Sequence, residues 1–343
     1  MNKGDYINYA RKIDSFFKQK KCLYFDKSEC SEVIIKSHTI QKKRSLQLIA
    51  ENGHVLGFSK NYNADEYSSP IVLSPIGIND ASTFYGFCKT HDNKLFHPID
   101  DFEFEPTDEQ VYLLTYRTFI KELYSKMADV DSYSTMNEFL GKIDNLPTPF
   151  RDNVESHYMG AEWGKQDNYH FASIMFNHIK ENDFTGIKYV MLEIDTIPEV
   201  MISGLVTPEF DYEKNRIQNL SRDPYQKNFA LNVFSDGSKG IVLFSWLENL
   251  GVEAFIESLF QQNDYFNKII EIGFTFLNNI YFNETWYNNL SVIKKSRIVK
   301  MMHNLIHYDF DTGEYTGIRK NNLHYVDWKI KNVKTNIENF TWL

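Results

Sequence analysis

Two short stretches of the chain decide its fold: CLYFDKSECSEVIIKSHTIQKK at residues 22–43 and FYGFCKTHDNKLFHPID at residues 84–100. They hold all three cysteines of the chain, and residues 22–100 also hold four of its ten histidines. Thiols gathered at one end of a chain, with histidines beside them, are more typical of a metal site than of scattered core residues. We therefore expect the first hundred residues to be built around a metal ion.

Zinc is the metal that this set of residues favours. It takes four ligands in a tetrahedron, usually thiolate sulfur and imidazole nitrogen. Cys88 and His91, with two residues between them, can reach one ion from a single turn. Cys22 and Cys30 would supply the second pair across a gap of seven residues. The sequence therefore predicts one structural zinc ion held by these four side chains.

Other interpretations of the cysteines stay open. His38 or His97 would replace one of the four residues if that residue is not a ligand. The three cysteines could also be ordinary buried thiols, because free Cys is among the most buried residue types. A disulfide is disfavoured, since residues 1–21 are charged throughout and lack the apolar region of a signal peptide. We expect a cytoplasmic protein with reduced thiols, and no membrane span, because no stretch approaches about 18 apolar residues.

The order of these residues resembles the treble-clef zinc fold of the HNH endonucleases, the His-Me finger group. The matching segments are VIIKSHTIQ at residues 33–41 and GFCKTHDNKLF at residues 86–96. The resemblance implies an N-terminal treble-clef module with a structural zinc. It also implies that His38 is the general base and that Asp92 or His97 lies near the ligand position of a catalytic Mg²⁺ or Mn²⁺.

These roles would be chemically coherent in a metal-dependent nuclease, that is, a phosphodiesterase. A neutral histidine can take a proton from water near pH 7. A hard cation polarises the phosphoryl oxygen and stabilises the charge that develops there. The alternative is that His38 is a hydrogen-bonded structural residue or a zinc ligand.

The charge of the chain is uneven. The net charge is −9, but residues 1–100 carry 14 Lys and Arg against 11 Asp and Glu, and the remainder carries 23 against 35. A mildly basic module beside an acidic body fits phosphate contact confined to the first module. If that module binds DNA or RNA, we expect four basic residues that flank His38 to contact the phosphate backbone: Lys36, Lys42, Lys43 and Arg44. The alternative is that these four residues are a solvated charge run.

The remaining pattern predicts an α+β protein with a treble-clef module at residues 1–105 and a mixed helix and antiparallel-strand body at residues 106–343. Thr107 and Gln110 form a capping box that opens a helix through about residue 127. The other expected elements follow as ranges: helices at 4–20, 136–143, 150–182, 252–261, 264–282 and 291–307; strands at 32–37 and 54–58 and in five runs between 186 and 246; a loop at 59–80; no pattern after 308.

Two classes of function are favoured for the whole chain, and a third reading is that the body itself is the active part. The first is a nucleic-acid-directed endonuclease of the HNH type, whose pairing with an unfamiliar body resembles antiviral defence proteins of bacteria. The second is a non-catalytic zinc-containing binding protein whose body recognises a partner protein. Nucleotide-binding loops and hydrolase elbows have no support, because the chain lacks G-x-x-x-x-G-K-[ST], G-x-G-x-x-G and G-x-S-x-G.

Overall fold

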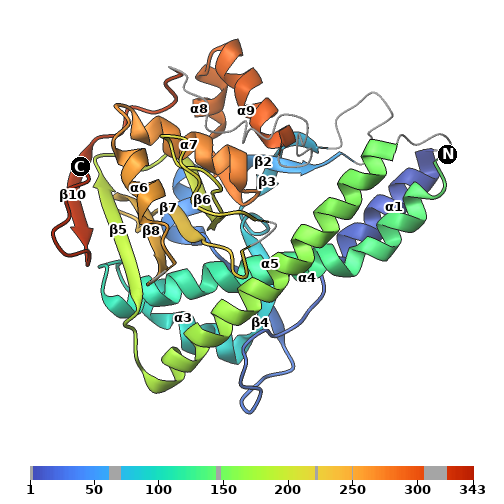
Figure 1. Cartoon of the computed structure of the whole chain (residues 1–343), viewed down its shortest axis with the longest axis horizontal. Coiled ribbons are helices and arrows are strands. Elements are labelled where there is room, and N and C mark those ends of the chain that lie inside the picture. The colour runs from blue at the N-terminus through green and yellow to red at the C-terminus, as the bar shows by residue number, and fades with distance from the viewer. Residues whose placement is uncertain (1–2, 62–70, 144–147, 221–222, 249, 305–322) are drawn as a thin grey trace.

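The central strands are apolar on both faces, and this places the sheet in the middle of the protein. Along β5 (Ile187–Ile194), Val190 and Leu192 belong to one hydrophobic core, whereas Tyr189 and Met191 belong to another. Successive side chains of a strand point to opposite faces of the sheet. Both faces must therefore be covered, and helices cover each of them (Figure 1).

The computed structural model describes residues 3–61, 71–143, 148–220, 223–248, 250–304 and 323–343. Its helices are α1 (Lys3–Phe16), η1 (Lys42–Leu46), α2 (Gln47–Ile49), α3 (Lys89–Asp100), α4 (Asp108–Leu140), α5 (Thr148–Glu181), α6 (Glu253–Phe260), α7 (Tyr265–Phe276), α8 (Glu284–Asn289) and α9 (Val292–Asn304). Its strands are β1 (Ile34–His38), β2 (His54–Lys60), β3 (Ile71–Gly77), β4 (Thr83–Cys88), β5, β6 (Val200–Val206), β7 (Phe229–Ser235), β8 (Gly240–Leu247), β9 (Ile280–Phe282) and β10 (Ile330–Thr335).

Eight of these strands form one antiparallel sheet in the order β10-β5-β8-β7-β6-β9-β2-β3. The other two, β1 and β4, form a separate antiparallel pair that leads directly into α3. The mixture of helices and antiparallel strands confirms the predicted α+β class. No described helix is both long and apolar enough to span a bilayer.

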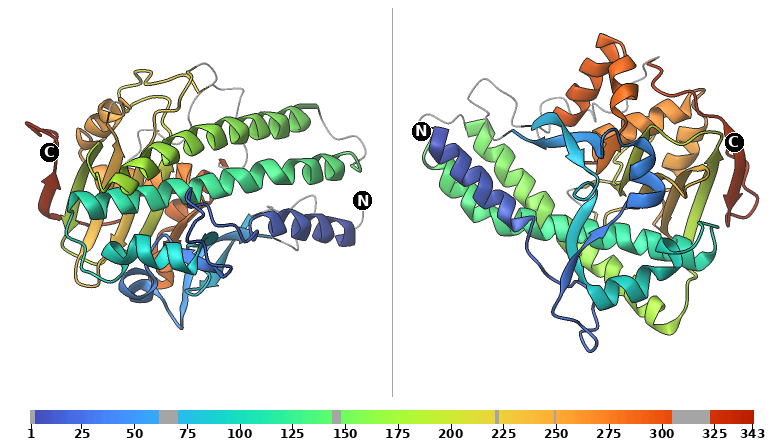
Figure 2. Two further views of the ribbon diagram at one scale, coloured as in Figure 1. Left: turned by 90° about the horizontal axis from the view of Figure 1, so that it is seen from below. Right: turned by 180° about the vertical axis from the view of Figure 1, so that it is seen from behind.

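Helices α3, α4 and α5 share a core with one face of the sheet, and α6, α7 and α9 share a core with the other. The far parts of α4 and α5 extend beyond the sheet, where α1 lies beside α4 (Figure 2). The Thr107 side chain accepts a hydrogen bond from the Gln110 N–H at 3.2 Å, as the capping box predicts. Helix α4 continues to Leu140, so two expected helices are one, because α1 and α5 pack along its second half and no Gly or Pro interrupts it.

Several expected elements were wrong in the structure. Residues 71–77 were expected as loop but form β3, where Pro75 is tolerated because β3 is an edge strand. The expected helix at 264–282 ends at Phe276, and its last residues form β9 between β6 and β2. The tail without a pattern contains β10, which pairs with β5. The expected strand at 216–221 is absent from its described residues, 216–220, where Arg216 forms an isolated β-bridge with Phe210.

The division at residue 105 stays a prediction, but the two segments share one sheet. Strand β2 pairs with β9, with Leu56 opposite Phe282, and β3 pairs with β2. The segment 1–105 therefore contributes β2 and β3 at one edge of the sheet, and the segment 106–343 contributes the other six strands.

Gly240 gives a test of the sheet packing. A Cβ atom there would lie 2.3 Å from the Thr196 carbonyl oxygen and 2.5 Å from Ile194 Cγ1. We expect Gly240→Ala to lower the free energy of unfolding by about 1–3 kcal/mol, because crowding of this kind forces a backbone shift. In chemical denaturation, Gly160→Ala is the control: its Cβ would have no neighbour within 4 Å, so it should be neutral or stabilising by up to about 1 kcal/mol. Equal effects of the two substitutions would contradict the described packing.

Candidate metal centre

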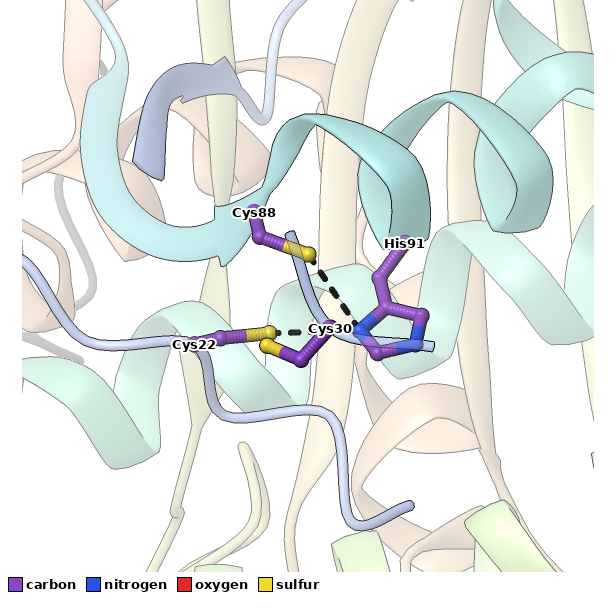
Figure 3. A group of neighbouring side chains, drawn as sticks. All are labelled: Cys22, Cys30, Cys88 and His91. Atoms are coloured by element: carbon purple, nitrogen blue, oxygen red, sulfur yellow. Dashed lines mark hydrogen bonds between the residues drawn. The ribbon is translucent and has the colours of Figure 1, made fainter. Parts of the chain in front are cut away.

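Four side chains from three parts of the chain meet in one place (Figure 3). They are Cys22, Cys30, Cys88 and His91, and their ligand atoms all lie within 4.8 Å of one another. His91 Nδ1 lies 3.4 Å from both the Cys22 and the Cys88 sulfur. This is the ligand set that the sequence predicts, and neither of the alternative ligands, His38 and His97, belongs to the group.

Local backbone structure explains why Cys88 and His91 meet. Cys88 is the last residue of β4 and the N-cap of α3, so His91 lies in the first turn of that helix. Strand β1 holds the end of β4 through the pairing of Ile34 with Cys88. Because Cys88 and His91 are separated by two residues at this strand-to-helix junction, their side chains lie close together.

The second pair of ligands comes from the segment before β1. The Leu23 N–H donates to the Gly86 carbonyl oxygen at 2.8 Å, which places Cys22 beside β4. Lys27 donates from Nζ to the Cys22 carbonyl oxygen at 2.6 Å. The chain then turns back, and the Ser31 N–H donates to the Cys88 sulfur at 3.4 Å. The loop between Cys22 and Ser31 is therefore folded over the junction of β4 and α3.

The geometry fits a tetrahedral zinc ion. With zinc–sulfur bonds near 2.3 Å and zinc–nitrogen bonds near 2.0–2.1 Å, a tetrahedron separates its ligand atoms by roughly 3.5–3.8 Å. The two sulfur–nitrogen distances of 3.4 Å are close to this value. The imidazole turns its Nδ1 edge toward the sulfurs (Figure 3). The group could therefore hold a metal ion such as zinc.

The thiols influence one another electrostatically. Burial alone would raise the pKa of the Cys88 thiol, but the N–H donors of His91 and Ser31 lower it to about 7. Partial burial of its sulfur, together with the neighbouring Cys22 and Cys88 thiols, raises the pKa of Cys30 to about 11. Without a cation, the neighbouring thiols therefore oppose ionisation of Cys30. A bound divalent ion would offset that opposition, because metal ligation requires the thiolate form.

An aromatic layer covers the imidazole. The Tyr24 ring lies 4.2 Å from the His91 ring, and Phe176 of α5 packs against Tyr24. Burial, and next the positive charge of Lys27, lower the pKa of His91. The neutral imidazole that a metal requires is therefore favoured, and α5 helps to shield the centre.

His38 lies apart from this cluster, at the end of β1. Its Nε2 is 3.3 Å from the Ile78 carbonyl oxygen, and the side chain is half-buried. Burial lowers the pKa of His38, and the Ile78 carbonyl oxygen opposes that effect. The imidazole is therefore mainly neutral at pH 7, the form that a general base requires.

Asp92 faces β1 from the first turns of α3. Its carboxylate accepts a hydrogen bond from the Ser37 hydroxyl, one residue before His38. Burial raises the pKa of Asp92, against the lowering effect of the nearby Arg117 charge. The Asp100 charge raises the pKa of both Asp92 and His38, so these groups share one electrostatic environment.

His97 is placed differently from the other two predicted catalytic residues. Its side chain is 55% exposed, and its Nδ1 lies 2.5 Å from the Asp101 carboxylate. The ring packs edge-on against Phe102. His38, Asp92 and His97 do not form a compact ligand group of the kind that the cysteines form, as judged over the described residues.

The sequence prediction did not include two residues near His38. Arg117 of α4 donates to the His38 carbonyl oxygen at 3.0 Å and to the Asp100 carboxylate at 2.7 Å. Its position gives a sequence signal, since it is the one charged residue in the run VYLLTYRTFI at residues 111–120. A charge inside such an apolar run needs a buried partner.

The basic residues near His38 are partly engaged within the chain. Lys36 pairs with the Asp80 carboxylate. Arg44 donates to the carbonyl oxygens of Phe102 and Asp101, the latter at 3.0 Å. Lys43 is exposed.

Comparisons with protein-family models, with curated proteins and with solved structures found no match.

Metal analysis tests the cluster directly. We expect purified protein to contain about one zinc ion per chain and Cys88→Ser to lose it, because a hydroxyl is a poor substitute for a thiolate ligand. Zinc content should fall as the pH is lowered, since protons compete for the sulfurs. Ser28→Ala, in the same loop, is the control and should keep its zinc. Protein without bound metal, and with the same melting temperature in the presence and absence of zinc, would refute the site.

Proposed function

We propose that this protein is a nucleic-acid-directed phosphodiesterase of the HNH type, with a structural zinc ion and a dependence on Mg²⁺ or Mn²⁺. The observation that carries the proposal is the unit β1–β4–α3. Its two strands pair and run into a helix, with the metal-binding cluster at the junction, His38 at the end of β1 and Asp92 on α3. A zinc-stapled strand–strand–helix unit is the scaffold that the treble-clef resemblance implies.

The residues of the unit have chemically suitable roles. His38 is held neutral by burial and can accept a proton from water. Asp92, beside Ser37, offers a carboxylate oxygen on the neighbouring element. A hard cation bound there would neutralise charge on the scissile phosphate. His97 is a weaker candidate for this role, because it is exposed and pairs with Asp101.

Nucleic acid is the proposed substrate class because of the charge around His38. Lys42 and Lys43 lie on η1, which follows β1, and Lys43 is exposed. Lys36 and Arg44 could exchange their present partners for phosphate oxygens. The acidic remainder of the chain limits the contact to this face.

A second candidate is a non-catalytic zinc-containing binding protein. The observation that favours it is that both proposed catalytic groups already have partners within the chain: His38 contacts the Ile78 carbonyl oxygen, and Asp92 accepts from Ser37. The body would then recognise a partner protein. Either function is compatible with a role in antiviral defence, which we propose only by analogy of architecture.

Loss of the proposed base gives the first functional test. We expect His38→Ala to lower the rate of DNA or RNA cleavage in Mg²⁺ or Mn²⁺ by about 10²–10⁴-fold, the usual contribution of a general base. Zinc content and melting temperature should change little, since His38 is outside the cluster. His54→Ala is the control, because the His54 side chain is exposed on β2 and its hydrogen bond is local, to the Asn52 carbonyl oxygen. Cleavage that is equally fast in His38→Ala would exclude the role.

The pH dependence gives the second test. The pKa of His38 is lowered from its ordinary value of 6.5, so the neutral base is fully present above that value. Cleavage should therefore be independent of protonation near pH 7 and decline as the pH falls below about 6.5. The decline should disappear in the residual activity of His38→Ala. A rate that rises toward low pH would contradict a basic role for this histidine.

A further inference from the structure

Arg117 is a charged side chain in the middle of the core. It is 2% exposed, and it lies on α4 between Tyr116 and Thr118, which are also buried. A buried guanidinium is costly unless charged and polar partners surround it. The contacts of Arg117 therefore explain why the position is occupied by this residue.

Those contacts converge on the His38 site. Arg117 Nη1 donates to the His38 carbonyl oxygen at 3.0 Å, and Nη2 donates to Asp100 Oδ2 at 2.7 Å. The guanidinium also lies over the Phe96 ring, with its carbon 4.1 Å from the centroid. The planar guanidinium of Arg117, on α4, thus connects the end of β1 to the last turn of α3.

We infer that Arg117 is a positioning residue for His38, so that the body completes the site that the first hundred residues carry. The inference rests on the proposed function for its kinetic consequence, but not for its structural one. A planar guanidinium with several fixed N–H groups can hold a carbonyl oxygen and a carboxylate together, and an ammonium group cannot reproduce that geometry.

Neighbouring contacts indicate that the fold does not depend on Arg117 alone. The Thr39 N–H donates to the Ser82 carbonyl oxygen at 3.0 Å, and Asn279 Nδ2 donates to Thr39 Oγ1 at 2.8 Å. The chain just after His38 is thus anchored separately. Arg117 fixes the peptide of His38 itself against α3.

The charged groups around His38 give a readout that needs no activity. They are Lys42 from η1, Asp92 and Asp100 from α3, and Arg117 from α4. The Arg117 charge lowers the pKa of His38, and the Asp100 charge raises it. Removing the guanidinium should therefore move the titration of His38 to higher pH.

The experiment uses the full chain with Arg117→Met and Arg117→Lys, and with Lys121→Met as the matched control. Lys121 lies one turn along the same helix with a side chain that is 13% exposed, and it donates to Asn278 at 3.1 Å. NMR would follow the imidazole signals of His38 against pH. Zinc content, melting temperature, and kcat and KM for cleavage in Mg²⁺ or Mn²⁺ would be measured on the same samples.

We expect the His38 titration to move to higher pH in Arg117→Met and to stay unchanged in Lys121→Met, with zinc retained in both. In Arg117→Lys the charge remains but the fork is lost, so the His38 signals should shift and kcat should fall about tenfold to a hundredfold with little change in KM. A His38 spectrum and titration identical to those of the unsubstituted protein in both Arg117 variants would overturn the inference. If Arg117→Met does not fold, the Arg117→Lys spectrum decides. If the unsubstituted protein cleaves nothing, the proposed function fails, and the NMR comparison still decides the role of Arg117.

Discussion

The structure depends on how α4 is buried. This helix lies between the sheet and α5, so its polar side chains must find partners inside the protein. Thr115 lies 2.7 Å from the Ser245 hydroxyl, and Arg117 reaches His38 and Asp100. These contacts hold the register of the helix along the sheet, and at the same time they attach the β1–β4–α3 unit to the body.

The β1–β4 pair explains why that unit needs such attachments. A two-stranded ribbon is marginally stable by itself. Two devices support it here. Phe84, Phe87 and Phe96 pack into the core that α4 shares with the sheet, and the group of three cysteines and His91 lies at the strand-to-helix junction. The first device makes the unit part of the body, and the second gives the loop before β1 a fixed path.

The same arrangement connects metal binding with the proposed chemistry. The cluster lies at the N-terminal end of α3, and Asp100, the partner of Arg117, is the last residue of that helix. The beginning of helix α3 therefore lies at the candidate metal site, and its end is bound by the Arg117 guanidinium. Asp92 lies on the helix between them and accepts a hydrogen bond from Ser37, the residue before His38. The proposed hydrolytic chemistry would require such fixed positions of its groups.

The amino-acid sequence by itself determined the local features. The capping box at Thr107, the α+β class and the group of three cysteines and His91 with its Cys88-x2-His91 junction follow from short-range rules of hydrogen bonding, strand pattern and coordination. Only the tertiary structure decided the rest: strand β3 at the sheet edge, strands β9 and β10, the continuous α4, and the meeting of Arg117 with His38 and Asp100. These features depend on partners far along the chain. Pairing at a sheet edge and burial of a charge gain their free energy from such distant groups, so a local pattern carries no record of them.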